Sequence, residues 1–211
     1  MLQALQRRWP LGHSTARSPR LLGPRAPFVI ALALAVAWPA GAEDMPLSAD
    51  LQVPLFLKIL TYDRRFESRF GTELKLGVVY APLDPQSVKA ANDITDVLYR
   101  YARKTVKRLP VNKVLVEFST PESLERSITT GSIDVLYVAP GSAKNVAAIV
   151  KVSRGRGVTT MAGVPDYVRS GVCVGLSVSQ DRPQILINQP ACLQEGSEFD
   201  ASLLRIATPV K

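Results

Sequence analysis

Short apolar runs alternate with stretches of helical periodicity along most of this sequence, and this alternation limits the folds open to the chain. Four of the runs are typical of buried strands: residues 74–80, 113–118, 134–138 and 158–162. An amphipathic stretch follows each of the first three, the longest at residues 85–107. Strands separated by helices require crossover connections, which predicts a largely parallel sheet with helices on both faces.

The pattern changes towards the C-terminus. Residues 171–178 and 183–188 form two apolar runs separated by four residues, a spacing typical of a β-hairpin. Two short helices are expected after them, at about 190–194 and 200–206. The sequence therefore predicts a single α/β domain with a mostly parallel sheet, a C-terminal antiparallel hairpin and short final helices.

The first 42 residues read as an export signal. Five arginines and no acidic residue accompany an apolar stretch at 28–38, and small residues follow at Ala40 and Ala42. This order predicts cleavage before Glu43. Eleven apolar residues span roughly 16 Å as a helix, which is short of the ~30 Å hydrocarbon core. We expect a signal peptide over 1–42 and a periplasmic α/β domain over 43–211; an uncleaved anchor or a buried core helix is the alternative.

The composition argues against several classes of function. The formal net charge is +8, but the leader carries +5 of it, and a weakly basic remainder gives no argument for a nucleic-acid partner. The single histidine, His13, lies in the leader, so the mature chain lacks the imidazole of common catalytic sets and metal sites. We expect no enzyme activity, no metal and no cofactor; a hydrolase that depends on Ser142 or Lys144 is the alternative.

The two cysteines, Cys173 and Cys192, are the sharpest local feature of the mature chain. In an oxidising compartment such a pair is typical of one disulfide. Folding the expected hairpin places Cys173 opposite residues near Asn188, one helical turn from Cys192. We expect a structural disulfide; two buried free thiols or a redox switch are the alternatives.

A turn after the third expected strand could hold an anion. Gly141, Ser142 and Lys144 lie where a parallel strand meets a helix, and backbone N–H groups there are available to a ligand. The spacing is not that of a nucleotide-binding loop. The alternative is an ordinary strand-to-helix turn with Ser142 as the N-cap.

Two C-terminal stretches resemble the YfiR/HmsC-like periplasmic proteins. Residues 171–176 followed by 183–191 are similar to the family's hairpin, whose second strand ends in an asparagine that starts a short helix. Residues 202–207 are similar to its closing helix. The resemblance implies a non-enzymatic regulator of an inner-membrane signalling protein. The expected partner is the periplasmic sensory domain of a diguanylate cyclase, which it represses, so that cyclic di-GMP and biofilm formation are controlled; a histidine kinase is the other expected partner.

The expected first helix, residues 49–62, offers a surface for such a partner or for a second copy of the chain. It has more apolar residues than one face packed on the sheet can bury, so some of them are expected to be exposed to a partner: Leu55, Phe56, Leu57 and Leu60. The alternative is that all of them belong to the core. A competing function is a small periplasmic solute-binding protein with a ligand over the carboxyl ends of the strands.

Overall fold

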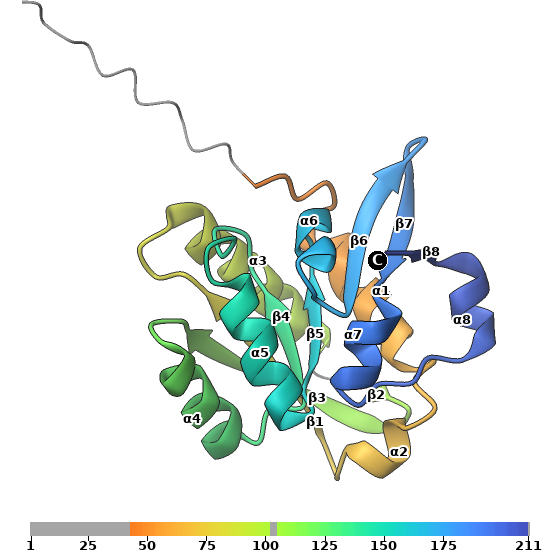
Figure 1. Cartoon of the computed structure of the whole chain (residues 1–211), viewed down its shortest axis with the longest axis horizontal. Helices are drawn as coiled ribbons and strands as arrows, with labels where there is room; N and C mark the ends of the chain where they lie inside the picture. Colours follow the sequence, from red (N-terminus) through yellow and green to blue (C-terminus); the bar gives the residue numbers. More distant parts are fainter. Residues whose placement is uncertain (1–42, 102–104, 211) are drawn as a thin grey trace, which may run out of the picture. The chain divides into compact units, whose positions relative to one another are not determined.

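The computed structural model describes residues 43–101 and 105–210, and the expected signal peptide, residues 1–42, lies outside them. Eight strands form one mixed sheet in the order β2-β3-β1-β4-β5-β6-β7-β8 (Figure 1). The strands are β1 Leu74–Tyr80, β2 Thr105–Val106, β3 Leu109–Glu117, β4 Val135–Val138, β5 Thr159–Ala162, β6 Val174–Ser179, β7 Arg182–Ile187 and β8 Thr208–Pro209. The helices are α1 Ala49–Leu60, α2 Phe66–Arg69, α3 Pro85–Tyr101, α4 Pro121–Gly131, α5 Val146–Arg156, α6 Pro165–Arg169, α7 Gln189–Gln194 and α8 Ala201–Ile206.

The centre of the sheet is parallel. Strands β3, β1, β4, β5 and β6 run in the same direction, whereas β6 and β7 form the expected antiparallel hairpin. The two short helices α7 and α8 follow the hairpin, and after them β8 pairs with β7 in parallel over two residues. The predicted fold class is therefore confirmed.

The strand order reverses between β1 and β4. From β1 the chain passes through α3 to β3 on one side, and from β3 it passes through α4 to β4 on the other side of β1. This is the order of a doubly wound sheet, in which ligands bind outside the carboxyl ends of the strands at the reversal point. A ligand site is therefore expected at the reversal point between β1 and β4.

Two hydrophobic cores cover the two faces of the sheet. Helices α1 and α3 pack on one face, where they meet Leu76 and Val78 of β1. Helices α4, α5 and α6 pack on the other, where they meet Val79 (Figure 1). Alternate residues of β1 thus enter opposite cores, as the period of a strand requires. Gly77 allows close packing, because a Cβ there would lie 2.8 Å from Leu136 Cδ2.

The expected helix at 85–107 was wrong at its end. Helix α3 is described to Tyr101, and the chain is already a strand at Thr105 and Val106. Lys107 and Arg108 have φ values of 45° and 75° and form the tight turn from β2 into β3. A left-handed conformation at two successive residues ends a helix, so pairing with β3 overrides the local helical pattern.

None of the helices in the described part of the chain is long and apolar enough to cross a membrane.

Candidate functional site

A segment without regular secondary structure, residues 43–47, lies near the carboxyl ends of β4 and β5; we call it the strap. Leu47 anchors it in the core, and its carbonyl oxygen accepts a 2.6 Å hydrogen bond from the buried Gln52 side chain. The Met45 sulfur accepts from the Tyr137 hydroxyl, and the Gln86 side chain donates to the Glu43 carbonyl oxygen. These contacts bring Glu43 to the reversal point of the sheet.

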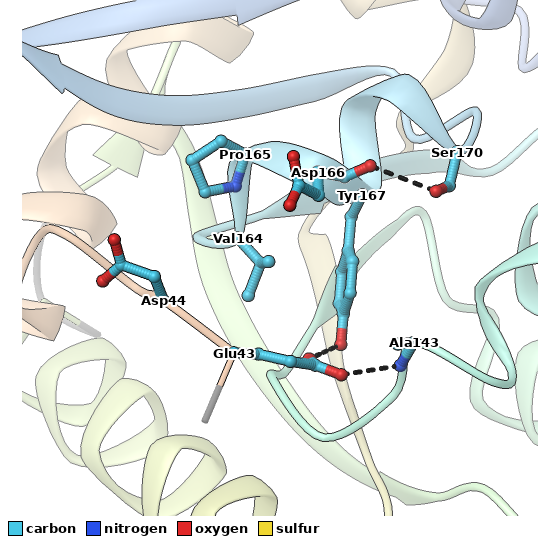
Figure 2. A pocket seen from close by; sticks show the side chains of 8 residues that line it. All are labelled: Glu43, Asp44, Ala143, Val164, Pro165, Asp166, Tyr167 and Ser170. Carbon is cyan, nitrogen blue, oxygen red and sulfur yellow. Dashed lines mark hydrogen bonds between the residues drawn. The ribbon is translucent and has the colours of Figure 1, made fainter. Parts of the chain in front are cut away.

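The Glu43 carboxylate is held by three donors. Oε2 accepts from the Gly141 amide at 2.6 Å and Oε1 from the Ala143 amide at 3.1 Å. The Tyr167 hydroxyl donates the third hydrogen bond, to Oε2. Figure 2 shows the carboxylate between Tyr167 of α6 and the turn that carries Ala143. All three donors are neutral. We call the turn 141–143 together with the Tyr167 hydroxyl the nest, because its donors surround a carboxylate.

The local sequence explains why the nest forms. Gly141 has a φ of 79°, and a Cβ there would lie 2.7 Å from Asp84 Cγ, so the turn needs glycine. Ser142 donates its amide hydrogen to the Tyr167 hydroxyl oxygen at 2.8 Å, which leaves the hydroxyl proton free to point at Glu43. Burial, together with the neighbouring Glu43, raises the pKa of Tyr167, so its hydroxyl stays protonated.

The turn that was expected to bind an anion holds the Glu43 carboxylate of the same chain. The residues that bind it differ in part from those expected. Gly141 supplies one amide, as expected from its position, and Ala143, which was not among the expected residues, supplies the second. Lys144 is exposed and is not among the carboxylate's partners. Ser142 is not the N-cap, because Asn145 takes that position in α5. The Ser142 hydroxyl is buried and has no hydrogen-bond partner in the described part of the chain.

An open pocket of about 520 Å³ adjoins the nest. Val164 and Pro165 line its apolar wall, whereas Asp44 and Asp166 give it an acidic rim (Figure 2). A volume of this size is in the range of small-molecule sites. The Glu43 side chain forms part of the lining, so the carboxylate lies between the nest and the pocket.

The expected partner surface on α1 was wrong. Phe56, Leu57 and Leu60 are buried in the core, with Leu57 only 7% exposed, and Leu55 is half-buried and packs against the same core. Helix α1 packs on α3 as well as on the sheet, so the apolar side chains that one face of the helix cannot hold are buried against this second neighbour. The exposed apolar residue of α1 is Leu51, at 51%.

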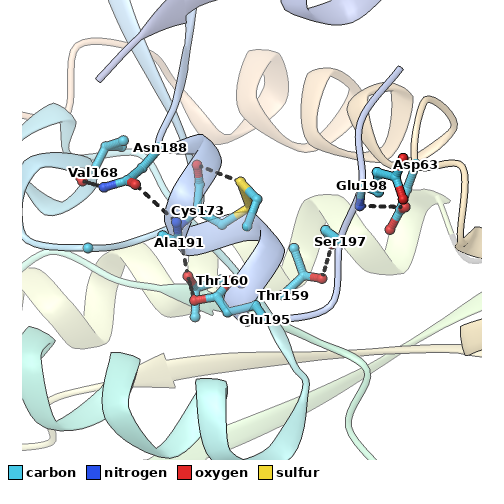
Figure 3. Close-up of a disulfide and its surroundings, with 12 residues drawn as sticks. Asp63, Thr159, Thr160, Val168, Cys173, Asn188, Ala191, Glu195, Ser197 and Glu198 are labelled. Carbon is cyan, nitrogen blue, oxygen red and sulfur yellow. Dashed lines mark hydrogen bonds between the residues drawn. A yellow bond between two sulfur atoms is a disulfide. The ribbon is translucent and has the colours of Figure 1, made fainter. Parts of the chain in front are cut away.

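Cys173 and Cys192 form a disulfide, with 4.6 Å between their Cα atoms, the pairing expected from the hairpin (Figure 3). The Cys173 amide also donates to the Thr160 hydroxyl, and Thr160 in turn donates to the buried Glu195 carboxylate through both its amide and its hydroxyl. The disulfide is thus one of several links that fix α7 to the end of the sheet.

No group of three or more histidine, cysteine or acidic residues in the described ranges could hold a metal ion. The described residues thus form a doubly wound α/β domain, with a carboxylate nest at the reversal point of the sheet and a pocket beside it.

A comparison with known protein families shows to which family this α/β domain belongs. The sequence pattern of the family DUF4154, described as YfiR/HmsC-like, matches residues 50–208. The chain therefore belongs to the YfiR/HmsC-like family, a family of periplasmic regulators. No curated protein matches this sequence significantly.

Solved structures share the fold. A conserved domain protein from Vibrio cholerae O1 biovar El Tor is similar with a TM-score of 0.56 and 15% identity, over 78% of this chain and 61% of that one. The ABC domain of a Streptococcus pneumoniae protein, solved in complex with L-Trp, has a TM-score of 0.53 and 12% identity over 78% and 60%. This chain spans about three fifths of either structure, and at these identities the likeness concerns the fold alone.

Proposed function

We propose that this protein is a periplasmic, non-enzymatic regulator that binds the periplasmic sensory domain of an inner-membrane diguanylate cyclase and represses it. Cyclic di-GMP, and with it biofilm formation, would then rise when the regulator is released. The observation that carries this proposal is the family match over residues 50–208, which covers nearly all of the described chain.

A regulator of this kind acts on a catalytic domain across the membrane, so it must change the conformation of the sensory domain that it contacts. Its binding has to favour the inactive conformation, and a coupling of about 1–3 kcal/mol corresponds to a 5- to 150-fold change in affinity between the two states. A single rigid domain can supply that coupling without binding nucleotide.

We propose that the partner instead contacts the exposed side of α1, where Leu51 is 51% exposed. Replacing Leu51 with Asp should weaken partner binding at least tenfold and leave the melting temperature within a few degrees. Leu57→Asp is the matched control on the same helix: it puts a charge into the core, so it should lower stability by several kcal/mol. Unchanged partner binding by the Leu51 variant would place the contact surface elsewhere.

Gene deletion in the native bacterium tests the function itself. Loss of the protein should raise cellular cyclic di-GMP several-fold, and the full chain should restore the original level. A chain that lacks residues 1–42 stays in the cytoplasm and should not restore it. Unchanged cyclic di-GMP after deletion would contradict repression of a cyclase and would turn the search to a histidine kinase partner.

A solute-binding role is the second candidate, and the carboxylate nest favours it. Two-lobed receptors close around their ligand, whereas residues 43–101 and 105–210 are built on one sheet. A thermal-shift screen of metabolite pools separates the two functions. Ligand at 100 times its dissociation constant stabilises a protein by about 2.7 kcal/mol, and a response of that size to one metabolite would favour the receptor.

A further inference from the structure

We propose that the nest formed by the turn 141–143 and the Tyr167 hydroxyl is a binding site for a small monocarboxylate, and that Glu43 occupies it as a tethered ligand. The inference does not depend on the regulatory function proposed above, because it concerns only what this site binds. It also gives the strap a role: a free carboxylate and the strap compete for the same donors.

The donors match a carboxylate atom by atom. Oε1 and Oε2 of Glu43 each accept an amide hydrogen, and the Tyr167 hydroxyl adds a third bond to Oε2. Tyr167 is only 2% exposed, and the Ser142 amide fixes the orientation of its hydroxyl. The site is thus built on one buried, oriented hydroxyl and two backbone amides at the protein surface, the half-buried Gly141 and the exposed Ala143.

The charges around the nest select the class of anion. Asp84 lies against Gly141, and Asp44 lines the adjoining pocket, whereas Asp166 is paired with Arg169. Asp84 and Asp44 repel phosphate and other multiply charged anions more strongly than a single carboxylate. The apolar wall of Val164 and Pro165 offers a surface to the carbon skeleton of the ligand.

The position of Glu43 makes it a displaceable occupant. The strap keeps its anchor at Leu47, in the core, when the carboxylate leaves the nest. A tethered group of this kind competes at an effective concentration in the millimolar range. A free carboxylate therefore binds the unchanged protein weakly, and it binds much better when the Glu43 carboxylate is removed.

Propionate, the nearest free analogue of a glutamate side chain, is the probe. It is titrated into ¹⁵N-labelled exported protein while the amide resonances of Gly141 and Ala143 are followed. In Glu43→Ala we expect saturable shifts of both resonances, with an apparent dissociation constant at least tenfold below that of the unchanged protein. Propionamide, which lacks the charge, and phosphate should give no saturable shift.

Two further variants complete the test. Asp44→Ala removes the neighbouring acidic residue but leaves Glu43 in the nest, so it should bind propionate as weakly as the unchanged protein. Tyr167→Phe in the Glu43→Ala background should weaken propionate binding at least fivefold. If Glu43→Ala does not fold, Glu43→Gln replaces it as a neutral occupant that propionate should displace more easily. Equal affinity in the unchanged protein and the Glu43 variant, or no saturable shift in that variant, would overturn the proposal and leave Glu43 as a structural contact only.

Discussion

Glu195 is a buried acid whose ionisation is linked to the stability of the fold. Burial raises its pKa to about 8, although its hydrogen bonds with Thr160 and the nearby Arg154 and Arg69 act in the opposite direction. The folded protein therefore keeps this proton at pH values where the unfolded chain, with a pKa near 4.5, has lost it. The contribution of Glu195 to stability is largest below pH 4.5 and falls as the pH rises towards 8.

Chemical denaturation at several pH values checks this linkage. Between pH 5 and pH 8 we expect the free energy of unfolding to fall with a slope of up to about 1.4 kcal/mol per pH unit from this group. Glu195→Gln, which is neutral throughout, should remove that slope. A variant whose pH dependence matches that of the unchanged protein would contradict the assignment.

Asp63 and Arg69 form a buried ion pair of 2.9 Å that ties the region after α1 to the C-terminal part of the chain. Asp63 accepts from the Glu198 amide, and Arg69 donates to the Ser197 hydroxyl and the Glu195 carbonyl oxygen. Asp63→Ala leaves a buried guanidinium unpaired and should cost about 3–5 kcal/mol of stability.

The chain offers a matched control for the Asp63 variant. Arg64 pairs with Glu198 next to the same junction, but both side chains are exposed. Arg64→Ala should therefore cost less than about 1 kcal/mol. Equal losses in the two variants, measured by urea denaturation, would show that burial does not set the importance of these pairs.

At the scale of elements, the disulfide joins the start of β6 to α7. Cys173 and Cys192 are 19 residues apart, so the bond closes a short loop around the hairpin. On the chain-entropy estimate a loop of this size stabilises the fold by about 3 kcal/mol. Replacing both cysteines with alanine should lower the free energy of unfolding by about that amount.

Thiol labelling gives the complementary measurement for the disulfide. Exported protein that is denatured without reduction should show no reactive thiol, since the described residues contain no free cysteine. Full labelling of both cysteines would contradict the disulfide, and an unchanged stability of the double alanine variant would contradict its structural role.

Elements with a strong pattern could be predicted from the sequence, and short ones could not. Strand β1 occupies the expected residues because five of its seven residues are buried and most of them are apolar, which leaves little choice. Helices α2 and α6 contain four and five residues, and β8 pairs over only two, so none of them shows a measurable period. The end of α3 was misjudged because β2 depends on pairing with β3, which a local pattern does not contain.

At the scale of the whole molecule, the parallel sheet could be predicted from the alternation of strands and helices. The group that occupies the site at the end of this sheet could not. The turn at 141–144 was visible in the sequence as a place for an anion. Its occupant was not, because Glu43 and Gly141 are 98 residues apart. Likewise, Leu57 looked like surplus apolar surface until α1 was seen to pack on two neighbours.

The proposed contact with a periplasmic sensory domain requires that the protein is exported. If a signal peptidase cleaves before Glu43, the mature protein begins with the residue whose side chain fills the nest. Intact-mass spectrometry of the periplasmic fraction should find a chain that starts at Glu43. An intact leader in that fraction would contradict both the cleavage site and the assignment of residues 1–42 as a signal peptide.

The central claim, repression by contact with a membrane protein, is tested most directly by reconstitution. The diguanylate cyclase with a periplasmic sensory domain from the same bacterium is placed in nanodiscs, and cyclic di-GMP synthesis is measured as the exported regulator is added. We expect a saturable fall of at least tenfold in the rate, with more of the Leu51→Asp variant needed for the same effect. A rate that stays constant at saturating regulator would show that the protein does not repress this cyclase by contact.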